Sequence, residues 1–431
     1  MASTVKHEPT RKRLKFNEWG RSTAFLVMGT FGGHKVDKSI QLEGSDALVG
    51  RSVGGGQSLV LSEACSLKMG RSVLELWLLW SVVMRVMIAL PIAYSASSTS
   101  SQEALLVSRI AFGSCANQSA PQVIGTWDDH DYGLNDAGKE FNGKITSQRL
   151  LLDFLDEPQD SPRRKQAGVY TSYTFGPVDR QIKVILLDTR YHRDPLFSDG
   201  SILGSSQWTW LESELKGPAS ALTIIGSSIQ VISNLSAITG PIFYLECWGR
   251  FPKERERLFK LIADSKVRDG VFFISGDVHF GEITRYDCAT GYPLFDITAS
   301  GITQAVEKAV PPPLNFIVRF VAWLAPTTMR VMGQHCRRKS CTYGQPNFGA
   351  IEIDWDATPV TVKMEVRDVN GFPVLSVNTS LLELQAQSVG ALYSIKPGEY
   401  RKHCSLEVTL PWIVRHRLAI LFFCALASKL S

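Results

Sequence analysis

VIGTWDDHDYGLND, residues 123–136, places a short apolar run directly before a dense group of polar side chains. That group consists of Asp128, Asp129, His130, Asp131, Asn135 and Asp136. A short apolar run indicates a buried strand, and clustered charges repel one another unless water or a cation screens them. The stretch therefore predicts a strand that ends at a metal or phosphate site, with a solvated acidic turn as the alternative.

Similar strand endings recur along the chain. IAFGSC ends at Cys115, KVILLD leads into Asp188 and Arg190, and VFFISG leads into Asp277 and His279. Open α/β sheets bind ligands beyond the carboxyl ends of their strands, so these endings are expected to converge. Asp277 and His279, two positions apart at a strand end, can face the same side, and a carboxylate with an imidazole suits a metal ion.

Two of these candidates also have an ordinary structural interpretation. A lone buried cysteine such as Cys115 is more often a small hydrophobic side chain. Arg190, like Arg193 and Arg285, could hold an anionic substrate through paired hydrogen bonds or could be a salt-bridge partner.

Apolar patterning divides the remaining chain. Residues 1–72 are rich in Gly, Ser and basic residues without periodicity, which predicts a disordered region. Residues 73–95 contain an apolar stretch with one charge, Arg85, and predict a transmembrane signal-anchor, with a buried helix as the alternative. Residues 410–428 form an apolar tail that is too short to span a bilayer, and they predict a membrane-associated segment.

Residues 108–370 have the pattern of an α/β domain. Short aliphatic runs alternate with amphipathic helical segments, one of which places Trp208, Leu211 and Leu215 on a single face. Nearly continuous apolar strands that alternate with helices predict sheets covered on both faces.

Charge and cysteine usage limit the possible partners and compartment. A formal net charge of +5 over 431 residues does not favour nucleic-acid binding. Basic residues before the apolar stretch predict a cytoplasmic N-terminus, with the rest of the chain luminal or extracellular in the secretory pathway. Cys336 and Cys341 are close enough in sequence to form a disulfide. Asn117, Asn234 and Asn378 begin glycosylation sequons, which also arise by chance.

Seven motifs occur in order between residues 109 and 369. They are FGSCANQ (112–118), TWDDHDYGLND (126–136), LLDTRYHRDP (186–195), SSIQV (227–231), WGRFPKERERL (248–258), SGDVHFGE (275–282) and YGQPNFGAIEIDW (343–355). As a set they resemble the PhoD-like, or alkaline phosphatase D, branch of the metallophosphatases. The resemblance implies a four-layer α/β/β/α sandwich and phosphoester hydrolysis at a multi-metal centre containing iron and calcium.

The resemblance also suggests roles for individual residues. The metal-ligand candidates are Cys115, Asn135, Asp277 and His279. His130 is implied to be a proton donor or phosphate contact, Asp129 is a second catalytic candidate, and Arg190 is a candidate for substrate binding. Two metal ions in such a centre would polarise phosphoryl oxygens and supply a hydroxide nucleophile.

One family motif is missing. The family carries a GDNxYGD-type motif between the GSC strand and the WDDHD strand, whose Asp bridges the metals and whose Tyr ligates the iron. Here residues 120–122 run directly into the second strand, although parallel neighbours need a crossover of about a dozen residues. The fold is therefore expected to be incomplete at one crossover, with exposed strand edges and poor binding of a second metal. The sequence predicts an impaired phosphoester hydrolase or, alternatively, an inactive membrane-anchored member with a binding or regulatory role.

Overall fold

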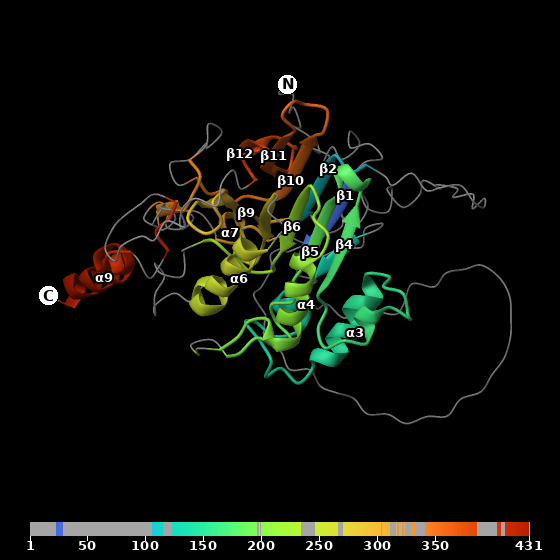
Figure 1. Ribbon diagram of the computed structural model, residues 1–431. Helices are drawn as coiled ribbons and strands as arrows, with labels where there is room; N and C mark the ends of the chain where they lie inside the picture. The colour runs from blue at the N-terminus through green and yellow to red at the C-terminus, as the bar shows by residue number, and fades with distance from the viewer. Residues whose placement is uncertain are drawn as a thin grey trace, which may run out of the picture. The chain divides into compact units, whose positions relative to one another are not determined.

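In the described part of the chain, two six-stranded sheets form the framework (Figure 1). The computed structural model describes residues 23–28, 106–114, 123–195, 198, 200–233, 246–265, 270–302, 304–310, 316, 319–320, 323, 329–332, 341–385, 403–406 and 410–430. The first sheet has the order β12 (Pro373–Ser380), β11 (Thr361–Asp368), β10 (Asn347–Asp354), β2 (Arg109–Gly113), β1 (Thr23–Met28) and β3 (Val123–Thr126). The second has the order β4 (Thr171–Phe175), β5 (Ile182–Leu186), β6 (Leu222–Gly226), β7 (Val271–Ser275), β9 (Leu294–Ala299) and β8 (Gly281–Tyr286). The predicted α/β class is confirmed.

Strand β1 lies between β2 and β3 and is parallel to both. Its Leu26 is aligned with Phe112 of β2 on one side and with Ile124 of β3 on the other. The segment 1–72, for which the sequence predicts no ordered structure, thus contributes a strand. The physical reason is that TAFLVM is a short apolar run, and two strand edges offer it partners on both sides.

The position of β1 accounts for the short connection between β2 and β3. This connection, residues 114–122, is too short for a helical crossover between adjacent parallel strands. The two strands are not adjacent, however, because β1 occupies the position between them. The expected exposed edges at this point in the sheet are therefore covered.

Leu26→Pro is expected to lower the free energy of unfolding of the full chain by about 1–3 kcal/mol, because it leaves a carbonyl of a neighbouring strand without its donor. Leu26→Val is the control, since it keeps the backbone N–H. Urea unfolding midpoints measure the difference. Equal midpoints for the two variants would show that β1 does not pair in solution.

The two sheets pack face to face through one large hydrophobic cluster. Ile110 and Phe112 of β2 meet a layer that includes Phe272 and Ile274 of β7, and all four side chains are buried. Strands β5, β6 and β7 are buried at every position, as their nearly continuous apolar sequences predict.

Helices α4 (Gly204–Lys216) and α6 (Pro252–Asp264) cover the other face of the second sheet. Trp208, Leu211 and Leu215 of α4 are buried there, in agreement with their predicted helical face. The described residues thus form three of the four predicted layers, namely the two sheets and the helices on the second sheet. Within these residues, no hydrophobic cluster joins a helix to a strand of the first sheet, so the fourth layer is not seen there.

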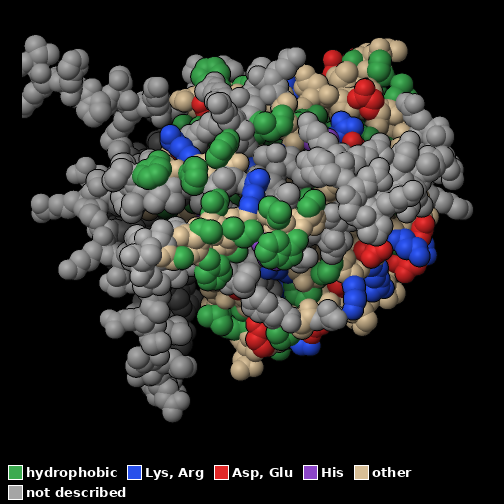
Figure 2. All heavy atoms as spheres, turned by 90° about the vertical axis from the view of Figure 1, so that its left-hand side faces the viewer, with side chains coloured by type: hydrophobic (Ala, Val, Ile, Leu, Met, Phe, Trp, Pro, Cys, Tyr) green, Lys and Arg blue, Asp and Glu red, His purple; other side chains and the backbone are tan. Residues whose placement is uncertain are grey.

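Other described helices lie around this framework. They are α2 (Asp129–Tyr132), α3 (Lys144–Phe154), α7 (Val306–Ala309) and α9 (Trp412–Leu430), with 3₁₀ turns at Pro162–Arg164, Val178–Arg180 and Trp248–Arg250. Helix α9 forms in the predicted apolar tail, and its Trp412 and Ile413 side chains are exposed. Figure 2 shows that hydrophobic side chains gather on one face of the molecule. Among the described helices, none has both the length and the apolar character needed to cross a bilayer. The predicted signal-anchor at residues 73–95 lies outside the described residues.

A disulfide joins two distant parts of the chain. Cys288 is bonded to Cys404, 116 positions further along the chain, with 5.4 Å between their Cα atoms. Cys341 is also disulfide-bonded. Because Cys336 lies outside the described residues, its pairing with Cys341 stays a prediction.

Candidate metal centre

The carboxyl ends of strands from both sheets meet at one place. Beyond β2, the backbone N–H of Ser114 donates to the carbonyl of Ala299 at 3.1 Å. The Ser114 hydroxyl accepts the backbone N–H of Asp277, beyond β7, at 3.4 Å. A Cβ on Gly276 would stand 2.4 Å from the Ser114 side chain, so the close approach of the two strand ends requires glycine. The predicted convergence of these strand ends is present.

Three carboxylates lie together where these strands end. Asp128 and Asp129 follow β3, and Asp277 follows β7 of the second sheet. One carboxylate oxygen from each of the three lies within 4.8 Å of those from the other two. Anionic oxygen donors at this spacing suit a hard cation, which would bridge residues that are far apart in sequence.

Backbone hydrogen bonds orient the two adjacent aspartates. The Asp129 carboxylate accepts the N–H of His130 at 2.7 Å and the N–H of Asp136 at 3.1 Å, one on each oxygen. The N–H of Asp128 donates to the Asp131 carboxylate at 3.1 Å, which closes the single turn of α2. Helix α2 therefore holds both carboxylates in place without a ligand.

The cluster carries an electrostatic cost that a cation would offset. Asp128 Oδ2 is buried and has no hydrogen-bond partner. Burial raises the pKa of Asp128 to about 6, although Arg190 opposes the shift, while Asp129 and Glu246 add to it. The pKa of Asp277 is raised well above its usual range by burial and by the charges of Asp128 and Glu246. The donor set and its unrelieved negative charge therefore fit a metal ion.

Buried ion pairs connect the cluster to a fourth carboxylate, that of Glu246. Arg190 is fully buried and forms ion pairs with Asp128 and with Glu246, the latter at 2.5 Å. Arg190 Nε also donates to Asp128 Oδ1 at 3.1 Å. Arg193, which is 1% exposed, pairs with the other Glu246 oxygen at 3.1 Å. Arg190 thus orients Asp128. The guanidinium that the sequence suggested for substrate binding pairs in the structure with two carboxylates of the chain, Asp128 and Glu246.

The GDVH segment has unusual backbone geometry. Asp277 and His279 have φ angles of 71° and 58°, in the left-handed region where non-glycine residues are uncommon and often functional. The N–H of His279 donates to the Ser300 hydroxyl at 2.9 Å. Burial lowers the pKa of the His279 imidazole, with Asp129 opposing the shift and His130 adding to it. A neutral imidazole is the form of histidine that binds metal ions.

The other sequence candidates lie in different surroundings. His130 is exposed beside the cluster, and Asn135 is exposed with its side-chain amide donating to the Asp136 carboxylate at 2.8 Å. Cys115 lies outside the described residues, directly after Ser114. The structure therefore brings Asp129 and Asp277 together with Asp128. His279 follows Asp277 by two positions, and Asn135 precedes Asp136, whose N–H donates to Asp129.

Asp188 also follows a strand but is fully engaged. One carboxylate oxygen accepts the Trp127 indole N–H at 2.8 Å and the N–H groups of Arg190 and Tyr191 at 2.9 Å. The other oxygen accepts the N–H of Val169 at 2.8 Å. These bonds tie β3, β5 and the chain before β4 together, so Asp188 has a structural role.

Sequence reasoning missed Glu246 as part of this site. It lies beside Cys247 and Trp248 and outside any pattern of metal ligands, and its significance depends on the two arginines that it meets. Only its acidic character within an apolar, aromatic segment marks it.

Two face-packed sheets with carboxylates gathered at their strand ends define an α/β protein with a candidate cation site. Comparison with known proteins shows which family part of the chain resembles. Residues 114–313 match the family model of the PhoD-like phosphatases, in agreement with the resemblance that the sequence motifs carry.

Two individual proteins are similar to this chain. Alkaline phosphatase D of Bacillus subtilis (strain 168) is 25% identical over 190 residues, which cover 38% of this chain and 32% of that relative. The chain thus matches about a third of the relative's length. A solved structure titled "Structure of PhoD" has a TM-score of 0.41 and 15% identity, and the match covers 60% of this chain and 51% of that one.

Proposed function

We propose that this chain hydrolyses phosphoesters with a metal ion held by Asp128, Asp129 and Asp277, with His279 as the nitrogen donor. The observation that carries the proposal is the meeting of three carboxylate oxygens within 4.8 Å at converging strand ends. The match of residues 114–313 to the PhoD-like phosphatases supports the reaction class.

The chain's own residues position the reacting groups. Arg190 neutralises part of the charge of Asp128 and keeps its carboxylate in one orientation through two donors. Asp129 fixes the start of α2 by accepting the His130 N–H, and the exposed His130 side chain directly follows Asp129 in the chain. His130 can therefore give a proton to the leaving oxygen. When bound, a metal ion supplies polarisation of the phosphoryl group and an activated water.

The same geometry limits the metal content. The described carboxylate donors form one cluster, and no GDNxYGD motif is present to supply a bridging aspartate. Two adjacent cations need an anion between them. We therefore infer one tightly held ion, with iron and calcium as the candidates, and hydrolysis that is weak for this reaction class.

Metal content and hydrolysis measured on the full purified chain test this proposal. We expect about one tightly bound ion per chain and metal-dependent cleavage of p-nitrophenyl phosphate or bis(p-nitrophenyl) phosphate. Two or more ions would show that other carboxylates replace the bridge. A bound ion without hydrolysis would favour a binding or regulatory role, and a chain that binds no ion would overturn the site.

Metal removal has a separate readout in stability. A ligand that binds only the native state at 100 times its Kd adds about 2.7 kcal/mol to the free energy of unfolding. Chelation is therefore expected to lower the thermal midpoint of the wild-type chain, and re-addition of the metal is expected to restore it. An unchanged midpoint, with the metal shown to be removed, would contradict a structural contribution from the ion.

A further inference from the structure

The sequon Asn378-Thr379-Ser380 ends strand β12, at the border of the first sheet. In the described sheet order, β12 is the terminal strand and pairs with β11 alone. Asn378 is exposed, whereas Thr379 is buried. The acceptor asparagine of this sequon is therefore accessible in the folded chain.

Asn378 belongs to the polar outer face of the sheet. It is aligned with Lys363 of β11, and Lys363 forms an ion pair with Glu365 on that same face at 2.7 Å. The alternate side chains, Val362 and Met364, point into the core between the sheets. A large group attached to Asn378 would therefore extend away from the core.

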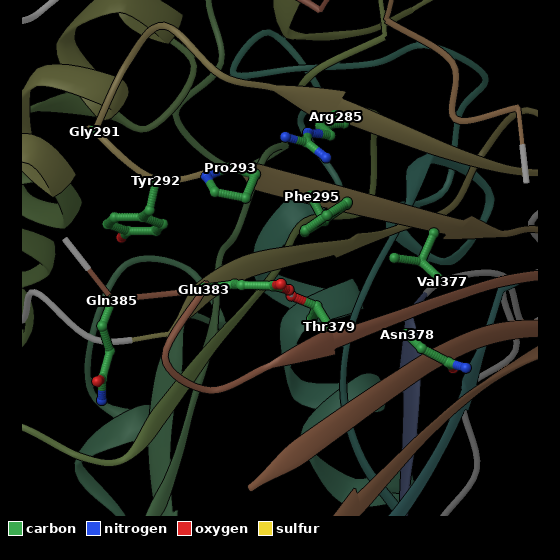
Figure 3. A pocket seen from close by; sticks show the side chains of 10 residues that line it. All are labelled: Arg285, Gly291, Tyr292, Pro293, Phe295, Val377, Asn378, Thr379, Glu383 and Gln385. Atoms are coloured by element: carbon green, nitrogen blue, oxygen red, sulfur yellow. The ribbon is translucent and has the colours of Figure 1, made fainter. Parts of the chain in front are cut away.

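The Asn378 amide is directed away from its neighbouring side chains. Asn378 is one of the residues that line a hollow of about 420 Å³, together with Arg285, Tyr292 and Glu383 among others. Figure 3 shows the Asn378 amide pointing away from Tyr292 and Glu383. The Asn378 amide is thus not taken up by the side chains that line the hollow.

The disulfides provide independent evidence about the compartment. Cys288 is bonded to Cys404, and Cys341 is disulfide-bonded as well. Stable disulfides form in oxidising compartments such as the endoplasmic reticulum lumen, where sequons are also glycosylated. An exposed sequon and disulfides together place the same domain in reach of the glycosylation machinery.

We propose that Asn378 is an N-glycosylation site. A separate transferase would join Asn378 Nδ2 to C1 of an oligosaccharide carried on a polyprenyl pyrophosphate. The new bond is C1–N, the C1–O bond to the pyrophosphate breaks, the polyprenyl pyrophosphate leaves, and the amide loses one proton. A glycan here stands at the open edge of β12, where it hinders edge-to-edge pairing with other chains.

Peptide mapping of the full chain produced in a eukaryotic secretory host tests this proposal. After peptide:N-glycosidase treatment in heavy-oxygen water, residue 378 is expected to be converted from asparagine to labelled aspartate. Non-reducing mapping of the same sample reports the Cys288–Cys404 bond. An unmodified Asn378 would overturn the proposal, whether or not the protein carries this disulfide.

Variants separate this site from the other two sequons. Asn378→Gln and Ser380→Ala are expected to remove one glycan from the intact mass, whereas Ser380→Thr retains it because threonine also completes the sequon. A mass difference between wild type and Asn378→Gln of only the one methylene group that the substitution adds would overturn Asn378 as an acceptor. Hydrolysis of phosphoesters does not enter this test, so its result is independent of the proposed activity.

Discussion

Asp277→Asn is expected to lower the rate of phosphoester hydrolysis at least about 100-fold. Removing a residue that only hydrogen-bonds to a metal ligand commonly costs 10–100-fold in activity, and removing a ligand itself is expected to cost more. The substitution removes one of the three clustered carboxylates. Asparagine keeps the side-chain shape and tolerates the left-handed backbone at φ 71° better than most residues. Initial rates and the bound-metal content of the full chain measure the effect.

Stability distinguishes loss of the metal from loss of the fold. Burial and neighbouring carboxylates disfavour the charged form of Asp277, so its neutral replacement is expected to unfold no more readily than wild type in chelator. With metal present, the order reverses because only wild type is stabilised by the ion. Asp287→Asn is the matched control, since Asp287 pairs with Arg285 and takes no part in the cluster. If both variants lost activity equally, Asp277 would have no special role.

Arg190→Met is expected to lower the free energy of unfolding by about 3–5 kcal/mol, which is the usual cost of removing one partner from a buried ion pair. The Arg190 side chain is fully buried between Asp128 and Glu246, so its loss leaves two carboxylates without this cation. Methionine fills a similar volume without a charge. Urea unfolding in chelator measures the change, so that metal loss does not contribute.

An exposed ion pair supplies the control for this prediction. Arg180 pairs with Asp356 where the two side chains are 41% and 88% exposed, so Arg180→Met is expected to cost about 1 kcal/mol or less. Adding Asp128→Asn to Arg190→Met is expected to restore part of the lost stability, because the carboxylate left without Arg190 is then neutral, while Glu246 keeps its ion pair with Arg193. Similar unfolding midpoints for Arg190→Met and Arg180→Met would show that the buried pairs contribute little.

Local patterns were sufficient for much of the fold. The α/β class followed from apolar strands alternating with helices, and the α4 face followed from the spacing of Trp208, Leu211 and Leu215. Positions of Asp129, Asp277 and His279 at strand ends followed from the apolar runs before them. These features depend on short-range periodicity, which each segment carries in its own residues.

Long-range partners were not available from such patterns. Asn135 lies within the acidic motif, and only the structure shows that its side chain is exposed with its amide donating to the Asp136 carboxylate. Arg190 could equally have held a substrate or a carboxylate, and only its burial between Asp128 and Glu246 distinguishes these possibilities.

The sequence by itself determined the α/β class, the seven ordered motifs between residues 109 and 369 and the absence of the GDNxYGD motif from its usual place. Tertiary structure alone decided that β1 enters the sheet between β2 and β3. It also decided that Asp128 meets Asp277 and that Glu246 joins Arg190. The physical reason is that hydrophobic periodicity and turn chemistry act over a few residues, whereas strand order and buried charge pairing arise when segments distant in sequence pack together.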